Sequence, residues 1–237
     1  MKKILEKTVE TLCIISQGRH RTNLLKKQEQ KALAFLVCRV PACVTSDMLT
    51  AIGFLGGVIT SLSFVLALYV DRYLLLLGIF GFLVNWFGDS LDGRLAYYRN
   101  APRKWYGFSL DITVDWITTI LIGFGFVIYA KGLAELLGLF FVVMYGWEMI
   151  TALLRYKITD KYSIDCGMIG PTEVRIIISI ILIMEVFIQG SIIYFAMVAC
   201  ACIFISNLIE TVKLLKAASM RDQKEKENSL VDSHTSL

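Results

Sequence analysis

The chain has 237 residues, of which 56% are hydrophobic, and its mean hydropathy is +0.64. This composition excludes an ordinary soluble domain and predicts an integral membrane protein. The formal net charge of +4 comes mainly from lysine and arginine next to the apolar stretches, so it indicates membrane topology and gives no case for nucleic-acid binding.

Residues 1–45 form the first expected unit, a cytosolic or interfacial segment. Residues 8–16 are apolar, but they are few and no small-residue cleavage pattern follows them, which argues against a cleaved signal peptide. Between Leu24 and Val37, large apolar residues are interspersed with lysines. This pattern predicts an amphipathic helix that lies on the membrane surface and ends before Pro41.

Residues 46–216 contain six apolar stretches that are long enough to cross a bilayer. We therefore expect an all-α, polytopic membrane protein in which six transmembrane helices form a bundle with a cytosol-facing polar cavity. The expected spans are 48–70, 73–97, 109–130, 133–156, 171–189 and 191–215. Residues 217–237 are polar, mixed in charge and rich in serine, so we expect them to form a disordered cytosolic tail.

Lysine and arginine gather on one side of the expected spans. Most of them lie in residues 1–47, 94–104, 155–161 and 213–237. Those on the opposite side are Arg72 and Lys131. The positive-inside rule therefore places both termini on the cytosolic side of the membrane. No organelle-targeting feature is apparent, which favours a bacterial inner membrane.

Four aspartates interrupt the second and third expected spans. Asp89 and Asp92 are three residues apart, and Asp111 and Asp115 are four apart, so each pair projects from one face of its helix. Carboxylates are costly inside a membrane and usually mark a functional site. If the two faces meet, mutual repulsion favours a cation between them, and oxygen-only ligands favour Mg²⁺ or Mn²⁺ over Zn²⁺. Since Mg²⁺ commonly binds with a substrate phosphate, we predict phosphate or pyrophosphate chemistry.

Two less specific interpretations of this segment stay open. Arg94, Arg99 and Arg103 are close enough in sequence to neutralise the aspartates as an ion-paired helix end. Gly93 and Gly107 are positions where a backbone could approach a ligand closely, but small residues also serve close helix packing in membranes.

The segment from Asp89 to Asp115 resembles the signature of the CDP-alcohol phosphotransferase family. That signature is Asp-x2-Asp-Gly-x2-Ala-Arg-x8-9-Gly-x3-Asp-x3-Asp, and this chain departs from it at one position, where Tyr97 stands in place of the arginine. The similarity extends upstream to residues 46–50 and downstream to residues 170–175, so it covers roughly residues 45 to 215.

This resemblance implies a metal-dependent transferase that releases CMP from a CDP-alcohol. Carried onto this chain, it implies two divalent ions, one held by Asp89, Asp92 and Asp111. The second ion would be held by Asp89, Asp111 and Asp115. Asp115 is the expected general base, which helps to deprotonate an acceptor hydroxyl, while the ions stabilise charge on the pyrophosphate. The family also implies a homodimer.

The resemblance further identifies residues expected close to the nucleotide. They are Asp47, Thr50, Gly93, Ala96 and Gly107. Asp47 and Thr50 have a second interpretation, because Ser46 or Asp47 would also be a good cap at the start of a helix.

Recognition of the acceptor depends on arginines outside the signature. Topology places Arg155, at the end of the fourth expected span, and Arg175, early in the fifth, where each could clamp a phosphate. Arg155 could equally extend toward the lipid headgroups. The hydroxyl of Tyr97 cannot replace the charge of the missing arginine, so we expect Arg94 or Arg99 to substitute for it.

Three functions are compatible with these features. The leading one is transfer from CDP-diacylglycerol, or a similar CDP-lipid, to inositol phosphate, glycerol phosphate or serine. The alternative is transfer of an ethanolamine- or choline-type headgroup from its CDP derivative to a lipid alcohol such as diacylglycerol or a ceramide. The third is a non-enzymatic cation-binding membrane protein or transporter, which would move cations and release no CMP.

Overall fold

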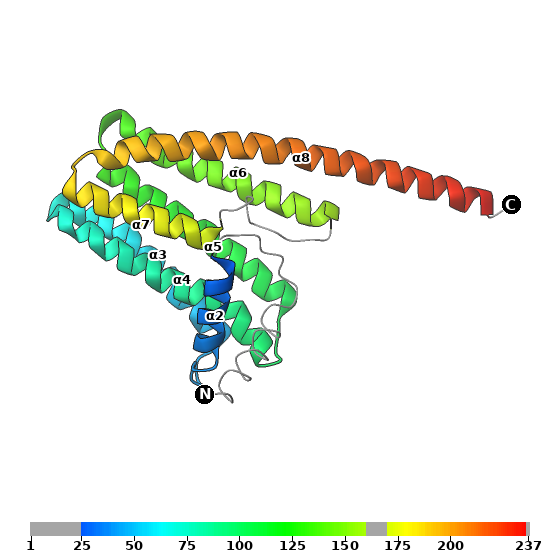
Figure 1. Ribbon diagram of the computed structural model, residues 1–237, viewed down its shortest axis with the longest axis horizontal. Coiled ribbons are helices and arrows are strands. Elements are labelled where there is room, and N and C mark those ends of the chain that lie inside the picture. The colour runs from blue at the N-terminus through cyan, green and yellow to red at the C-terminus, as the bar shows by residue number, and fades with distance from the viewer. Residues whose placement is uncertain (1–24, 160–169, 236–237) are drawn as a thin grey trace.

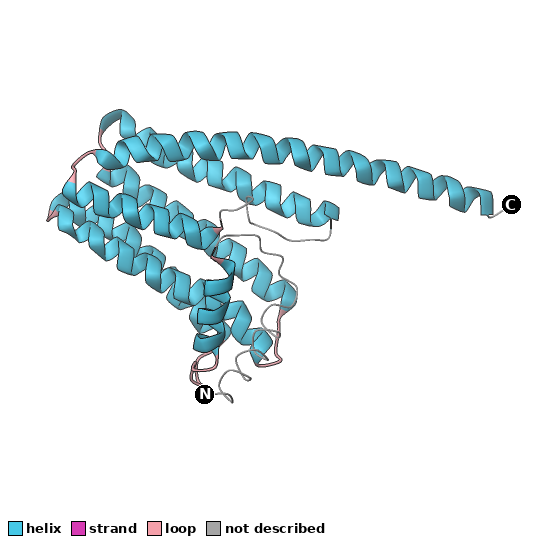
Figure 2. Ribbon diagram, viewed as in Figure 1, coloured by secondary structure: helices cyan, strands magenta, loops and turns pink. Residues whose placement is uncertain are grey.

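The computed structural model describes residues 25–159 and 170–235, and all regular structure in these residues is helical (Figures 1 and 2). Two short 3-10 helices, Arg72–Leu74 and Gly132–Ala134, precede α4 and α6. The α-helices are α2 (Lys26–Val37), α3 (Ser46–Tyr69), α4 (Leu75–Tyr98), α5 (Lys104–Tyr129), α6 (Glu135–Thr159), α7 (Pro171–Phe187) and α8 (Ser191–Thr235). The apolar stretch 8–16 lies outside the described residues.

Within residues 25–159 and 170–235, five helices are long and apolar enough to cross a membrane, which confirms an integral membrane protein. They are Ser46–Tyr69, Arg72–Tyr98, Lys104–Tyr129, Gly132–Thr159 and Ser191–Asn228. The fifth expected span is the 17-residue helix α7, which is shorter than the roughly 20 residues that usually cross a bilayer. It nevertheless packs against α4 and α8. The six-span count and the cytosol-facing cavity therefore stay predictions.

Helix α3 is the scaffold of the bundle, because both α4 and α5 pack against it. Its contact with α4 is close enough to exclude side chains: a Cβ added at Gly88 would lie 2.3 Å from the Gly53 nitrogen. Asn85 reinforces this contact by donating from Nδ2 to the Gly53 carbonyl oxygen at 2.9 Å. On the other side of α3, the Ser61 hydroxyl donates to the Leu121 carbonyl at 2.6 Å. The glycines thus fix α4, and the aspartates it carries, against α3.

Helix α2 packs against the ends of α3 and α4 that lie next to the aspartates. Its residues Leu33, Ala34 and Val37 are buried in one cluster with Leu49 of α3 and Leu91 of α4. The helix ends at Val37, as the approach of Pro41 predicts. Its placement on a membrane surface stays a prediction.

The turn between α7 and α8 is built around one buried carboxylate. Glu185 is 2% exposed. Its Oε1 accepts from the Tyr129 hydroxyl at 2.8 Å and from the Gly190 N–H at 3.0 Å. Its Oε2 accepts from the Ser191 hydroxyl at 3.3 Å and from the Ile192 N–H at 2.9 Å. Glu185 thereby caps the start of α8, where backbone N–H groups lack partners within the helix.

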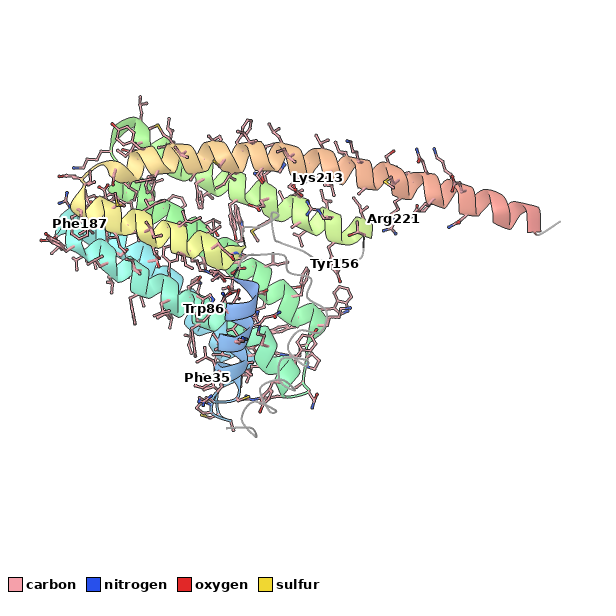
Figure 3. All side chains as sticks on the ribbon, viewed as in Figure 1. Phe35, Trp86, Tyr156, Phe187, Lys213 and Arg221 are labelled. Atoms are coloured by element: carbon pink, nitrogen blue, oxygen red, sulfur yellow. The ribbon has the colours of Figure 1, made fainter. Side chains whose placement is uncertain are left out.

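The polar tail differs from the expected disorder, because α8 continues as a helix of 45 residues to Thr235 and projects beyond the bundle (Figures 1 and 3). Arg221 explains part of this order. Its Nη1 donates to the carbonyl oxygens of Lys157 and Ile158, at 2.9 and 2.7 Å, and its Nε lies 2.9 Å from Glu225 Oε1. Ion pairs four residues apart favour helix over coil, a local effect that composition alone does not reveal.

Candidate active site

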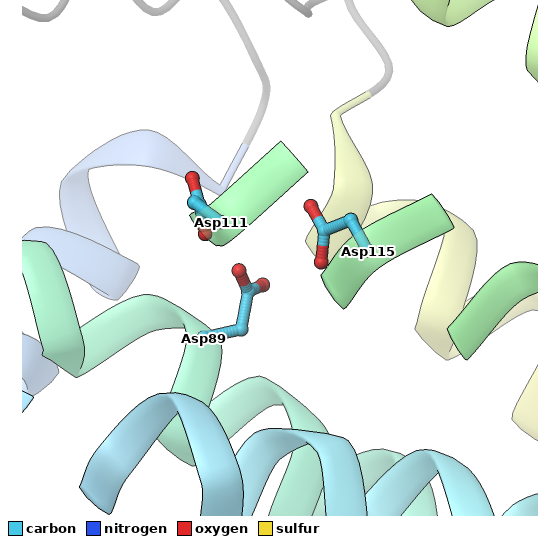
Figure 4. Close-up of side chains that lie close together, drawn as sticks. All are labelled: Asp89, Asp111 and Asp115. Carbon is cyan, nitrogen blue, oxygen red and sulfur yellow. The ribbon is translucent and has the colours of Figure 1, made fainter. Parts of the chain in front are cut away.

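Three of the four predicted metal ligands meet at one point between α4 and α5. Asp89, Asp111 and Asp115 each offer a carboxylate oxygen, and these oxygens lie within 4.8 Å of one another. All three side chains are partly buried, and Figure 4 shows their carboxylates facing a common space. The helical spacing explains why Asp111 and Asp115 point the same way, whereas the packing of α4 and α5 on α3 brings Asp89 to them.

The fourth aspartate is buried beside this group. The Thr50 hydroxyl donates to Asp92 Oδ2 at 2.7 Å, and the Gly93 N–H donates to Asp92 Oδ1. Asp92 also interacts electrostatically with Asp115. Thr50, which the sequence predicted near the nucleotide, is therefore held on the acidic motif by a direct hydrogen bond between α3 and α4.

Arg175 brings positive charge to the aspartates. Its Nη2 lies 2.6 Å from Asp89 Oδ2, and it also interacts electrostatically with Asp115. Both partners of this ion pair are mostly shielded from solvent, with side-chain exposures of 15% and 21%. The structure thus joins the fifth expected span to the acidic motif through a residue predicted to bind the acceptor.

The other predicted acceptor residues lie in different surroundings. Arg155 forms an ion pair with Glu210 of α8. Arg99 donates to the carbonyl oxygens of Val44 at 2.5 Å and Pro41 at 2.8 Å, so it ties the end of α4 to the connection between α2 and α3. These contacts give both arginines structural partners and do not bring them to the three aspartates.

The residues expected around the nucleotide lie along the same end of the bundle. Asp47 forms an exposed ion pair with Arg103, which immediately precedes α5. A Cβ built at Gly107 meets no atom of the described residues within 4 Å, so close helix packing does not explain this glycine. Gly93 and Ala96 lie in the last two turns of α4, and Ala96 is partly buried.

Helix α6 adds two residues that the sequence analysis missed. Tyr145 interacts electrostatically with Asp115, Arg175, Glu148 and Asp89. Glu148 lies three residues later on the same face of α6. A signal for Glu148 was present in the sequence, since it is a carboxylate inside an apolar span, which is the same reason that singled out the aspartates.

The donor set fits a hard divalent cation. Asp89, Asp111 and Asp115 supply oxygen ligands, as Mg²⁺ and Mn²⁺ prefer. Three carboxylates so close together repel one another, and a bound cation would relieve that repulsion. A metal held by these three carboxylates would supply positive charge to a phosphate-containing substrate.

Comparison with known families gives one match. The family described as CDP-alcohol phosphatidyltransferase matches residues 43–206, a range that includes all four aspartates, Thr50 and Arg175. No curated protein matches the chain.

Proposed function

Because the chain belongs to the CDP-alcohol phosphatidyltransferase family, we propose that it transfers a phospho-alcohol group from a CDP-activated lipid, such as CDP-diacylglycerol, to a polar acceptor. The family acts by such transfer in phospholipid synthesis. The observation that carries the proposal is the meeting of Asp89, Asp111 and Asp115 beside Arg175. The proposed acceptors are inositol phosphate, glycerol phosphate and serine, each of which offers a hydroxyl.

Metal binding is assigned to the four aspartates. Asp89, Asp92 and Asp111 would hold one Mg²⁺ or Mn²⁺ ion, and Asp89, Asp111 and Asp115 a second. When bound, two such ions supply charge stabilisation to the pyrophosphate and align it for displacement. The 4.8 Å grouping supports the second set directly. Asp92 lies outside that group and accepts a hydrogen bond from Thr50, so the first set rests on the family resemblance.

Asp115 is the proposed general base. Its carboxylate accepts the proton of the acceptor hydroxyl as the oxygen attacks the lipid-linked phosphorus of the donor. The bond between that phosphorus and the bridging oxygen of the pyrophosphate then breaks, and CMP leaves with the electron pair. The position of Asp115 in the group of three facing carboxylates supports this role, because a general base must lie beside the reacting phosphate.

Arg175 is the proposed acceptor residue. Its guanidinium already bonds Asp89, and a guanidinium has further N–H groups that could hold the phosphate of an acceptor. This arrangement supports a phosphorylated acceptor placed next to the metal ligands.

The ion pair of Arg155 with Glu210 favours the alternative function, in which the CDP group is on the headgroup and the acceptor is a lipid alcohol. With Arg155 engaged there, the acceptor side is less cationic than the sequence suggested. Transfer of an ethanolamine- or choline-type headgroup to diacylglycerol or ceramide would need less positive charge. In the first function the lipid carries the CDP group, and in the alternative the headgroup carries it. Identifying the donor that the protein uses therefore distinguishes the two functions.

The membrane orientation follows the positive-inside rule, with both termini and the aspartates on the cytosolic side. This orientation agrees with the chemistry, because nucleotide-activated substrates and Mg²⁺ are found in the cytosol. A homodimer, which the resemblance implies, is testable by chemical cross-linking in membranes.

The deciding experiment is release of CMP by the purified, full-length protein. CDP-diacylglycerol and CDP-ethanolamine would each be offered with a panel of acceptors in Mg²⁺ or Mn²⁺, with Asp115→Asn as the control. Metal-dependent release of CMP from one of the two donors, absent in the Asp115→Asn variant, would establish the reaction and show which substrate carries the CDP group. A folded protein that released no CMP with any pair, and that moved cations across vesicles, would overturn the proposal.

A further inference from the structure

Helix α2 turns its apolar face into the bundle, which leaves another face pointing outward. Leu33, Ala34 and Val37 are at most 1% exposed and pack against α3 and α4. The exposed side chains occupy the opposite side of the helix, within an arc of about 100°. They belong to Gln28, Lys31, Ala32 and Phe35. The apolar face that an isolated amphipathic helix would turn toward lipid is therefore already covered by the protein.

Arg39, just after the end of α2, extends the exposed side. Its Cζ lies 3.3 Å from the centroid of the Phe35 ring, and its Nη1 donates to the Phe35 carbonyl oxygen at 2.8 Å. Phe35 is 50% exposed, and Lys31 lies about one turn before it. The outer face of α2 thus consists of Gln28, Lys31, Ala32, Phe35 and Arg39. It combines two cations with an exposed aromatic ring.

The two cations of the outer face have no acidic partner among the described residues. The ion pairs in residues 25–159 and 170–235 involve neither Lys31 nor Arg39. Other arginines nearby are engaged, since Arg94 pairs with Glu29 and Arg99 donates to backbone carbonyl oxygens. Positive charge on the outer face is therefore available to an anionic ligand.

Two contacts at the start of α2 fix the direction in which the outer face points. Glu29 Oε1 lies 3.7 Å from Arg94 Nη2 of α4, and these side chains are 2% and 3% exposed. The Leu25 N–H donates to Oε1 of Glu173, in the first turn of α7, at 2.9 Å. Breaking a buried ion pair is strongly unfavourable. These contacts therefore hold α2 against rotation and keep its cations turned away from the bundle.

The outer face lies at the depth of the lipid headgroups. Helix α2 packs on Leu49, in the first turn of the span Ser46–Tyr69, and on Leu95, in the last turn of the span Arg72–Tyr98. The ends of spanning helices meet the headgroup layer. The positive-inside rule places these ends at the cytosolic leaflet, whose surface potential is negative.

We infer that the outer face of α2 binds the headgroups of anionic phospholipids in the surrounding bilayer, an interaction that goes beyond the proposed function. Lys31 and Arg39 supply the charge, and the guanidinium of Arg39 can donate two parallel hydrogen bonds to one phosphate. Phe35 lies between them as an aromatic anchor at the membrane interface. The cationic face of this amphipathic helix, and not its apolar face, is thus the one that contacts lipid.

The test is lipid binding by the full-length protein in detergent, measured by native mass spectrometry. The protein would be titrated with phosphatidylglycerol, which is anionic, and with phosphatidylcholine of the same acyl chains, which is zwitterionic. We expect the wild type to bind phosphatidylglycerol at least about tenfold more tightly, because each cation at an anionic surface strengthens binding about fivefold. The double variant Lys31→Gln, Arg39→Gln should lose most of this preference and bind phosphatidylcholine as the wild type does.

A second pair of lysines provides the matched control. Lys224→Gln with Lys226→Gln removes the same charge from the exposed part of α8 that projects beyond the bundle. This control should keep the wild-type preference for phosphatidylglycerol. Arg39→Lys keeps the charge without the two-pronged donor and should retain part of the preference.

Three outcomes would overturn the inference. They are equal affinity of the wild type for the two lipids, a full preference in the Lys31→Gln, Arg39→Gln variant, and an equal loss in the α8 control. The last result would show an effect of general charge. None of these measurements depends on catalysis, so failure of the inference leaves the proposed transferase function intact, and absence of CMP release leaves the inference intact.

Discussion

Near its two ends, α7 takes part in two carboxylate sites with opposite surroundings. At its start, Arg175 meets Asp89, which belongs to a group of three aspartates whose oxygens lie within 4.8 Å. At its end, Glu185 is a single buried carboxylate that accepts hydrogen bonds from four donors. The donors to Glu185 are the hydroxyls of Tyr129 and Ser191 and the backbone N–H groups of Gly190 and Ile192.

The difference shows how a structural carboxylate can be told from a functional one in an apolar bundle. Glu185 is satisfied by the protein itself, so its burial stabilises the turn before α8. The aspartates instead concentrate negative charge, which only an additional cation would neutralise in full. The predictions below test this distinction, beginning with the change that should have the largest effect.

Asp115→Asn should abolish most of the catalytic activity and leave the fold intact. The variant loses the proposed general base, so CMP release should fall by roughly a hundredfold to ten-thousandfold. Its melting temperature in detergent should be unchanged or higher, because removing one of three clustered charges lowers their repulsion. CMP release together with thermal unfolding measures both effects. Activity near that of the wild type would contradict the assignment.

Glu185→Ala should lower the stability of the protein and leave its catalytic activity nearly unchanged. Four donors lose their acceptor, and we expect unfolding to become easier by about 3 kcal/mol, as for other buried polar groups left unpaired. Specific activity of the folded fraction should stay close to that of the wild type. Glu185→Gln, which keeps one acceptor oxygen, should be intermediate. An unaltered melting temperature for Glu185→Ala would show that these hydrogen bonds do not stabilise the turn.

Arg175→Ala and Arg155→Ala should separate the two arginines that the sequence predicted as acceptor ligands. Arg175 bonds Asp89, so its removal should lower activity about ten- to a hundredfold, chiefly as a higher KM for a phosphorylated acceptor. Arg155 pairs with Glu210, so its loss should change activity by less than about twofold. Equal effects in acceptor titrations would contradict this division. Tolerance of both substitutions would favour headgroup transfer to a lipid alcohol.

Alanine substitutions at Gly107 and Gly88 should have the smallest effects and test the placement of the nucleotide. A Cβ at Gly107 meets open space, so Gly107→Ala should stabilise α5 by roughly 0.5–1 kcal/mol and still weaken CDP binding, because the methyl group enters the space proposed for the nucleotide. Gly88→Ala is the control. Its Cβ would lie 2.3 Å from the Gly53 nitrogen, so it should destabilise the bundle by about 1–3 kcal/mol. Unchanged CDP affinity in Gly107→Ala would refute the placement of the nucleotide.

The local features of this protein were predictable from its amino-acid sequence. Hydropathy located the membrane helices, and the expected span 48–70 agrees closely with α3, Ser46–Tyr69. Spacing placed Asp111 and Asp115 on one helical face, since that depends only on the helical period. Composition predicted disorder for residues 217–237, whereas α8 continues to Thr235, with Arg221 paired to Glu225 and bonded to the end of α6.

Which charged groups meet became evident from the packing of the helices. The sequence predicted both Arg155 and Arg175 as acceptor ligands, yet one pairs with Glu210 of α8 and the other with Asp89 of α4. The pairing of Asp47 with Arg103 joins residues 56 positions apart. Such contacts depend on which helix faces pack together, and here those faces are set by close approaches such as that of Gly53 to Gly88. A helical period fixes the direction of a side chain on its own helix, whereas its partner is fixed by the neighbouring helix.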